Sequence, residues 1–207
     1  MQACANEQAA TVRERLTKVF ETYGLPLRIL CDNGSPWGAT GSDERHTTLT
    51  VWLLDLDVEV SHGRPYHPQT QGKDERFHRT LREDVLDRTS LADLAAAQSA
   101  FDDWRPIYSN RRPHEALDLD VPASRYASSS RAMPAVITPA QYETGAEVRK
   151  VQQEGWFSFK GRAHRWSKAF VGKTIALRPT DIDGVFDIYY RRHRLSQVDL
   201  REPMSQT

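Results

Sequence analysis

The spacing of apolar residues changes character once along this chain, at residue 147. Before that point, segments with an apolar residue at every third or fourth position are separated by short segments of alternating apolar residues. After it, only the alternating pattern remains, interrupted by turns at close intervals. Helices and strands in alternation are typical of an α/β layer with a largely parallel sheet, whereas short strands joined by turns are typical of small barrels. The sequence therefore predicts a mixed α/β part followed by a small all-β part.

Turn and capping signals divide the first part into elements. Two prolines and two glycines between His62 and Gly72 exclude regular structure there. Ser90 with Asp93 resembles the N-cap signature of a helix, and this helix is predicted to end before Pro106. The expected elements are a helix over 7–23, a strand over 27–31, a helix over 49–56, a short strand over 58–60, helices over 73–88 and 91–105, and a short helix over 122–126.

Composition excludes several classes of protein. The chain has 207 residues, of which 39% are hydrophobic and 27% charged, values that exclude collagen-like and wholly disordered chains. Its two cysteines, Cys4 and Cys31, form no Cys-x-x-Cys pair, so neither a disulfide framework nor a thiolate zinc site is expected. No segment has the basic and apolar pattern of a signal peptide or the length of a membrane span. We expect an intracellular, cytoplasmic protein with no membrane partner.

The net charge of zero conceals two parts of opposite sign. Residues 1–146 contain 16 Lys and Arg against 21 Asp and Glu, whereas residues 147–207 contain 12 against 7. A basic module is suited to a polyanionic partner, although many small basic β modules are only soluble domains. Charge alone leaves both interpretations open.

Two acidic residues occupy positions that suit metal chemistry. Asp32 ends the strand over 27–31, and Glu75 opens the helix after the Pro/Gly-rich loop. Carboxylates at such rims suit hard cations such as Mg²⁺, and Arg79 and Arg82 follow Glu75 on the same helix face. The alternative is that Asp32 caps the strand end and Glu75 with Arg79 forms a surface ion pair worth about 0.3–0.5 kcal/mol.

Three blocks carry a resemblance to a known family. They are CDNGSPWG over 31–38, SHGRPYHPQTQGKDERFHRTL over 61–81 and YSNRRPHEAL over 108–117. Over residues 7–126 the chain resembles the integrase core of bacterial insertion-sequence transposases, which are relatives of retroviral integrases. The resemblance implies an RNase H-like fold in which two aspartates and a glutamate hold two Mg²⁺ ions for attack on a phosphodiester. It assigns Asp32 to the second aspartate and Glu75 to the glutamate, both as catalytic and metal-binding residues, and it implies an SH3-like barrel that binds DNA after the core.

One departure from the family pattern bears directly on activity. The first aspartate of the family lies on an early strand, yet residues 1–31 contain no Asp, only Glu7, Glu14 and Glu21. We expect a truncated or mis-started reading frame, or one product of a split gene, with weak or no strand transfer by this chain alone. Whether the chain is itself an enzyme is therefore left open. The strand over 27–31 is expected to have an exposed edge, because its neighbours would be missing.

Further polar residues are candidates for contact with DNA. Cations among the aromatic residues of the second part suit a phosphate backbone, although the rings themselves are equally typical of a barrel core. His62, His67 and His78 fit no zinc pattern. The segment Asn110–Leu117 is suited either to packing under the catalytic helix or to contact with DNA. The candidate DNA-binding residues are Gln69, Gln71, Lys73, Arg79, Arg82, Lys160, Arg162, Arg165 and Lys168.

The resulting hypothesis is a protein of two parts joined by a linker. Residues 1–126 form a partial RNase H-like core, 127–146 a linker and 147–201 an SH3-like barrel. The function is DNA transposition by Mg²⁺-dependent cleavage and strand transfer. The partners are transposon-end DNA, target DNA and further transposase subunits in a homo-oligomer. The alternative is a non-catalytic DNA-binding or regulatory fragment of a transposase.

Overall fold

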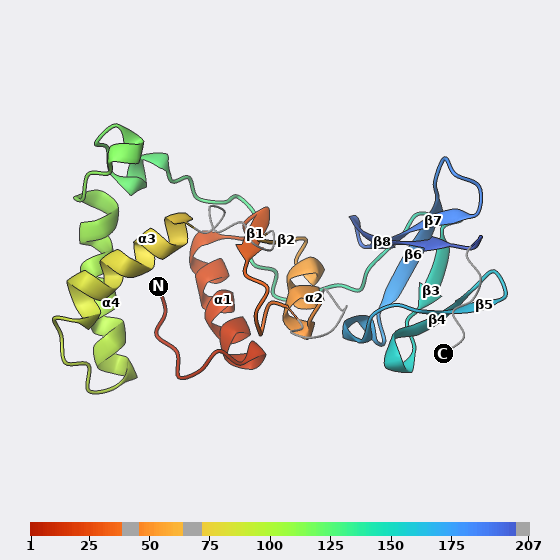
Figure 1. Cartoon of the computed structure of the whole chain (residues 1–207), viewed down its shortest axis with the longest axis horizontal. Helices are drawn as coiled ribbons and strands as arrows, with labels where there is room; N and C mark the ends of the chain where they lie inside the picture. The colour runs from red at the N-terminus through yellow and green to blue at the C-terminus, as the bar shows by residue number, and fades with distance from the viewer. Residues whose placement is uncertain (39–45, 64–71, 202–207) are drawn as a thin grey trace. The chain divides into compact units, whose positions relative to one another are not determined.

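The computed structural model describes residues 1–38, 46–63 and 72–201, and Figure 1 shows their secondary structure. The chain divides into two compact units, each built from two stretches that are distant in sequence. Unit 1 contains residues 1–25 and 63–132, and unit 2 contains residues 26–62 and 133–207. The first part of the chain is mixed α/β and the part after residue 147 is an antiparallel β region, which confirms the expected fold class at this level.

Unit 1 is helical in the residues that the structure describes. The second helix, α3, continues directly into the short π-helix η2, which shifts the phase of the side chains that follow it. Its elements are α1 (Ala9–Tyr23), α3 (Gly72–Leu81), η2 (Arg82–Leu86), α4 (Leu94–Asn110) and the 3₁₀ turns η3 (Glu115–Leu117) and η4 (Pro122–Arg125).

Helix α1 ends as the sequence predicts, at Gly24. This residue has φ of +77°, and its backbone N–H donates to the carbonyl of Phe20 at 2.9 Å. A Cβ built at this position would lie 2.7 Å from the carbonyl oxygen of Ser129, so the close approach of the chain also requires glycine. Gly24 therefore both ends α1 and admits the segment around Ser129 beside it.

Helices α3 and α4 are held together by a small apolar cluster. Leu81, Val85 and Trp104 are buried, and Phe77 and Tyr108 pack against them. In Figure 1, α3 lies across α4. The sequence predicted that this helix would end before Pro106, but α4 continues through Pro106 to Asn110. The packing of α3 on α4 explains the difference. A proline removes one backbone hydrogen bond from a helix, but Trp104 and Tyr108 are anchored on either side of it. The N-cap of α4 is Asp93, which accepts from the N–H of Ala96 at 2.8 Å.

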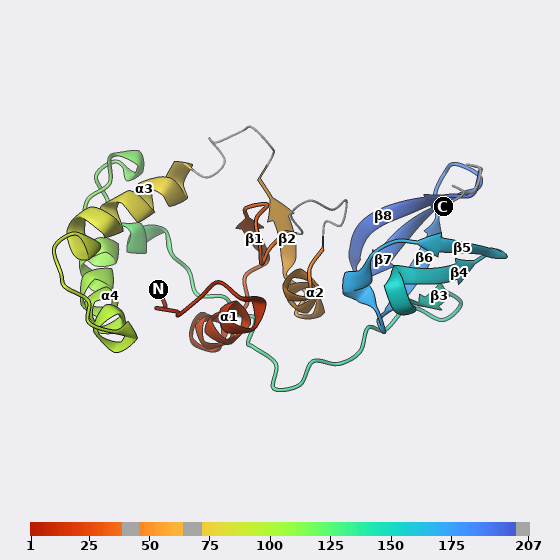
Figure 2. The same ribbon diagram turned by 60° about the horizontal axis from the view of Figure 1, so that its bottom comes forward.

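Unit 2 begins with a strand-helix-strand segment. Strands β1 (Arg28–Cys31) and β2 (Glu59–His62) pair in parallel, with Cys31 opposite His62. Helix α2 (Thr48–Asp55) connects them, as Figure 2 shows. Within the described residues this sheet has two strands, and the side chain of Leu30 is 48% exposed. In this part of the structure β1 has one strand partner, β2, and the exposed edge expected for β1 stays a prediction.

The C-terminal β region contains strands joined by tight turns. Its four-stranded antiparallel sheet has the order β3-β6-β7-β8, and β4 and β5 form a separate hairpin. The Asp183-Gly184 turn joins β6 to β7 as predicted, with Gly184 at φ of +78°. The elements are β3 (Glu147–Lys150), η5 (Gln153–Gly155), β4 (Trp156–Phe159), β5 (Arg162–Arg165), η6 (Lys168–Phe170), β6 (Thr174–Pro179), β7 (Val185–Tyr190) and β8 (His193–Asp199).

Aromatic residues of this region form its core. Phe157, Phe159 and Phe170 are each 1% exposed or less. The ring of His164 stacks on Phe157 with centroids 5.4 Å apart. These contacts favour packing over base stacking as the role of the buried rings, whereas Trp156 is 37% exposed. Among the described residues, no helix has the length and apolarity needed to cross a membrane.

The position of His164 predicts a pH dependence of stability. Burial lowers the pKa of His164, and the charge of Arg162 adds to this effect while a backbone hydrogen bond at Phe159 opposes it. The neutral ring is thus favoured in the folded state, so its contribution to stability is present above about pH 6.5, the ordinary pKa of histidine, and is lost as pH falls below that value.

We expect the thermal midpoint of the parent to fall more between pH 7.5 and 5 than that of His164→Phe, which keeps a ring on Phe157 but cannot titrate. His78→Phe, at an exposed histidine of α3, serves as the control and should retain the dependence of the parent. A proton NMR titration in which His164 has a midpoint at or above 6.5 would contradict the prediction.

Candidate active site and nucleic-acid interface

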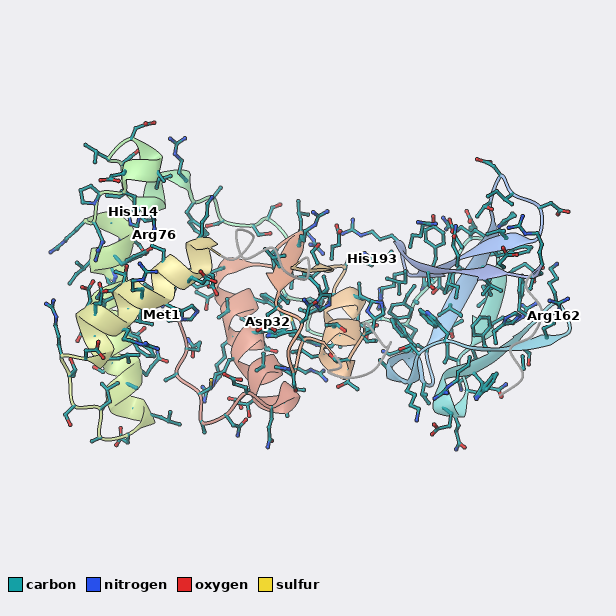
Figure 3. The ribbon with its side chains drawn as sticks, viewed as in Figure 1. Met1, Asp32, Arg76, His114, Arg162 and His193 are labelled. Atoms are coloured by element: carbon teal, nitrogen blue, oxygen red, sulfur yellow. The ribbon has the colours of Figure 1, made fainter. Side chains whose placement is uncertain are left out.

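Asp32 is held by a turn at the carboxyl end of β1. Its Oδ1 accepts from the backbone N–H of Gly34 at 2.9 Å, and its carbonyl oxygen lies 2.9 Å from Nδ1 of His62 at the end of β2. Figure 3 labels Asp32. The carboxylate is exposed, so it is available to a ligand at the rim of the parallel strands.

Cys31, next to Asp32, is not a reactive thiolate. Burial raises the pKa of the Cys31 thiol to about 12, and the charge of Asp32 adds to this effect. A protonated thiol is a poor nucleophile and a poor metal ligand. Of these two neighbours, Asp32 and not Cys31 is therefore the candidate metal ligand.

Glu75 lies in the first turn of α3, beside Asp74. Both side chains are exposed, and the helix N-terminus favours negative charge there. On this helix, Nε2 of His78 lies 3.4 Å from Oδ2 of Asp74. Lys73, Arg79 and Arg82 are exposed on the same segment. The predicted combination of an acid with cations along one helix is therefore present.

The two acids belong to different units, Asp32 to unit 2 and Glu75 to unit 1. Each is described within its own unit, and the site that they would form together stays a prediction. Within residues 1–38, 46–63 and 72–201, no three His, Cys, Asp or Glu side chains gather as a metal centre requires. Carboxylate oxygens suit Mg²⁺, so Asp32 and Glu75 fit as two of its ligands, and no reaction step through a metal is derived from them.

The segment that follows α4 packs against the helix that carries Glu75. Arg112 donates to Asp84 Oδ2 at 2.8 Å, and the indole N–H of Trp104 donates to the same oxygen at 3.0 Å. Tyr108 contacts Phe77 and His114 edge to face, with centroids 5.3 and 5.1 Å apart. These contacts favour packing as the role of the Asn110–Leu117 segment, one of the two alternatives that its sequence left open.

Most of the candidate cations of the β region have partners within it. Lys160 pairs with Glu147 at 2.8 Å, Lys168 pairs with Glu154, and Arg162 donates to the carbonyl of Leu200. The hydrogen bond from Lys160 lowers the pKa of Glu147, and the one from Lys168 lowers the pKa of Glu154. Arg165 is exposed. A phosphate that contacts Lys160 or Lys168 would therefore compete with a carboxylate. The sequence pattern did not reveal this competition.

Two of the predicted DNA-binding residues cannot be placed, and several contacts of other residues were not predicted from the sequence. Gln69 and Gln71 lie outside the described residues. The spacing of residues did not predict that one oxygen of Asp84 accepts from both Trp104 and Arg112, because these partners are 20 and 28 residues away. Cations that it also missed are Arg149, whose guanidinium lies 5.4 Å from the ring centroid of Phe159, and Arg178, which lies 4.5 Å from that of Tyr189. Alternation along β3 and β6 marks these positions only as strand residues.

Two family models match separate segments of the chain. Residues 56–122 match the integrase core domain, and residues 146–206 match the C-terminal domain of the IS481 family transposases. The first match includes Glu75 and the second includes the four candidate cations of the β region. These matches confirm the resemblance to insertion-sequence transposases. The chain is thus similar to an integrase core over residues 56–122 and to a transposase C-terminal domain over residues 146–206.

Individual relatives agree with these models. The chain is 26% identical over 196 residues to the "Putative transposase for insertion sequence element IS5376" of Geobacillus stearothermophilus, covering 90% of this chain and 46% of that protein. It is 31% identical over 111 residues to an insertion element IS136 protein of Agrobacterium fabrum, covering 53% of each. The chain spans about half the length of these curated relatives. A chain in the structure of the simian T-cell lymphotropic virus intasome in complex with a PP2A regulatory subunit is 18% identical, with a TM-score of 0.46 over 91% of this chain and 64% of that one.

The shared oxygen of Asp84 predicts a measurable loss of stability. Asp84→Asn removes the charge that accepts from Trp104 and Arg112, and hydrogen bonds to charged groups contribute about 1.5–3 kcal/mol each. Because the Asp84 side chain is 29% exposed, we expect a decrease of only about 1–2 kcal/mol in the free energy of unfolding. Urea unfolding followed by tryptophan fluorescence measures it. Asp103→Asn, at an exposed position of α4, is the control, and equal effects of the two substitutions would contradict the prediction.

Proposed function

We propose that this chain is the part of a DNA transposase that supplies two acidic residues and a DNA-binding C-terminal domain for cleavage and strand transfer. The observation that carries the proposal is the match of residues 56–122 to the integrase core, since this segment includes Glu75 and strand β2, which pairs with the strand that Asp32 follows. The position of Asp32 at the end of a parallel strand supports the same assignment. Asp32 and Glu75 are proposed as catalytic and metal-binding residues.

The proposed architecture follows from the strand order. The parallel pair β1–β2 with its connecting helix is the type of unit found in RNase H-like folds, and the antiparallel strands β3 to β8 are consistent with a small SH3-like barrel. We assign residues 1–126 to a partial core, 127–146 to a linker and 147–201 to the barrel. These boundaries are functional assignments along the sequence, whereas the compact units pair residues 26–62 with the C-terminal region.

Mg²⁺ is the proposed cofactor, with Asp32 and Glu75 as two of its ligands. When bound in a two-metal site, such ions stabilise the attacking and leaving oxygens of a phosphodiester exchange. Two carboxylates alone supply less charge than two ions require, which is why further ligands are needed for activity. The chain by itself is therefore proposed to have weak or no strand transfer activity.

A second candidate function is a non-catalytic DNA-binding or regulatory fragment of a transposase. Its support is the positive net charge of residues 147–207, which contain 12 Lys and Arg against 7 Asp and Glu and so suit a polyanionic partner. Such a fragment would still bind DNA and further transposase subunits. It differs from the first proposal only in whether Asp32 and Glu75 take part in chemistry.

Strand transfer separates the two candidates. A labelled transposon end is incubated in Mg²⁺ with this chain, or with a chimera in which the first strands and aspartate of an integrase core precede residue 7. We expect activity only in the chimera, and we expect Asp32→Asn and Glu75→Gln each to reduce it about 100-fold or more, since even outer-shell changes at metal sites cost about 10–100-fold. Asp74→Asn is the control on α3. Robust transfer by the unmodified chain would contradict the expectation that this chain alone is weak or inactive, and an unchanged rate in Asp32→Asn would contradict the first proposal.

DNA binding has its own test. The proposed contacts are Gln69, Gln71, Lys73, Arg79 and Arg82 in the core, together with the cations Lys160, Arg162, Arg165 and Lys168 of the C-terminal domain. Affinity for duplex DNA should fall steeply with salt, and Arg165→Ala should reduce the slope of log K against log salt by about 0.9. Lys18→Ala on α1, whose lysine pairs with Glu14 at 3.1 Å, should leave the slope unchanged. Binding that is undetectable or independent of salt would exclude this part of the proposal.

A further inference from the structure

Helix α2 contributes side chains to the core of the C-terminal β region. Val51 and Leu54 are each 2% exposed, and they belong to the same buried cluster as Phe170, Ile175 and Tyr190. These residues are separated by more than 100 positions in the sequence, yet they lie within one compact unit. The β region therefore uses a helix from outside the matched C-terminal domain to complete its core.

The last residue of α2 places a buried carboxylate in this contact. The side chain of Asp55 is 10% exposed, and its Oδ2 lies 2.6 Å from Nζ of Lys173. Its Oδ1 accepts from the hydroxyl of Tyr190 and lies 3.6 Å from Nε of Arg191. Burial raises the pKa of Tyr190, and the hydrogen bond to Asp55 and its charge raise it further. Three polar groups from the β region thus converge on one carboxylate of α2.

A second, more exposed contact lies beside the first. The carbonyl of Asp57 accepts from Arg192 at 2.8 Å, and Oδ1 of Asp57 lies 3.5 Å from Nε of Arg192 and 3.6 Å from Nε2 of His193. Asp57 has φ of +55°, which turns the chain between α2 and β2. The negative end of a helix and two carboxylates therefore meet the cations at the β7–β8 turn. Figure 3 labels His193 at this turn.

We propose that the acidic end of α2 is a docking surface for the C-terminal domain of the same chain. In this arrangement the domain is held against the segment that ends in Asp32, and residues 127–146 do not act as a free tether. Apolar contact at Val51 and Leu54 supplies attraction, and Asp55 makes the contact specific, because a buried carboxylate without its partners is strongly unfavourable. Lys173, Arg191 and Arg192 serve this contact and are not counted among the residues that bind DNA.

The last hairpin offers a matched pair of arginines for the test. Arg192 and Arg194 are 59% and 54% exposed, so neither is needed to fill a core. Arg192 contacts Asp57 beyond the end of α2, whereas Arg194 pairs at 2.7 Å with Asp187 of its own domain. Arg192→Ala weakens the proposed docking contact, and Arg194→Ala removes an ion pair of similar exposure that does not involve α2.

Distances between spin labels measure docking directly in the full chain. Labels are attached at Leu27→Cys and Ile182→Cys, both exposed positions of unit 2, with Cys4→Ser to remove the exposed native thiol. Cys31 is buried and is left in place. We expect one narrow distance distribution in the parent and in Arg194→Ala. In Arg192→Ala and Asp55→Asn we expect distributions about twice as wide or more, since weakly joined domains move relative to one another.

Three results would overturn the proposal. They are a broad distribution in the parent, equal widths in Arg192→Ala and Arg194→Ala, and a narrow distance that disappears when labelled chain is diluted with unlabelled chain, which would place a second copy at the docking surface. If Asp55→Asn fails to fold, the two arginine variants still decide the outcome. The measurement requires neither DNA nor strand transfer, so its failure is distinguishable from failure of the proposed function.

Discussion

The structure of unit 2 depends on helix α2, which is buried on every side. Six consecutive residues of α2, from Leu49 to Leu54, are buried, including the polar Thr50. A helix that is apolar on all sides has to be covered on all sides. The parallel pair β1–β2 is packed beside it, and the C-terminal β region takes Val51 and Leu54 into its own core. The burial of α2 therefore joins β2 to the C-terminal β region, although the two match separate family models.

Local signals predicted most elements of the fold, and distant contacts account for the exceptions. The end of α1 at Gly24 and the turn at Asp183-Gly184 follow from residues that adopt positive φ or favour turns, so the sequence was sufficient there. Helix α4 continues past Pro106 because aromatic packing outweighs one lost backbone hydrogen bond. The docking of α2 was not predicted, because the spacing that marks an apolar helix does not reveal which surface covers it.

The candidate site shows the same division between local and distant information. Strand and turn chemistry placed Asp32 at the end of β1, and helix periodicity placed Glu75 at the start of α3. The charge count of the C-terminal part predicted a basic surface, but it could not show that Lys160 and Lys168 have carboxylate partners or that Arg191 faces Asp55. Net charge limits how many phosphates a domain can neutralise, whereas pairing decides which cations are free to do so.

The two carboxylates of the proposed site are each held by their own unit, which constrains how they could share a cation. The turn at Gly34 fixes Asp32, and the packing of Phe77 and Asp84 against α4 fixes the helix of Glu75. A cation that bound both would have to offset the loss of water from two carboxylates. Anchoring the C-terminal domain on α2 reduces the number of parts that must be ordered, because DNA held by that domain is then already fixed relative to Asp32.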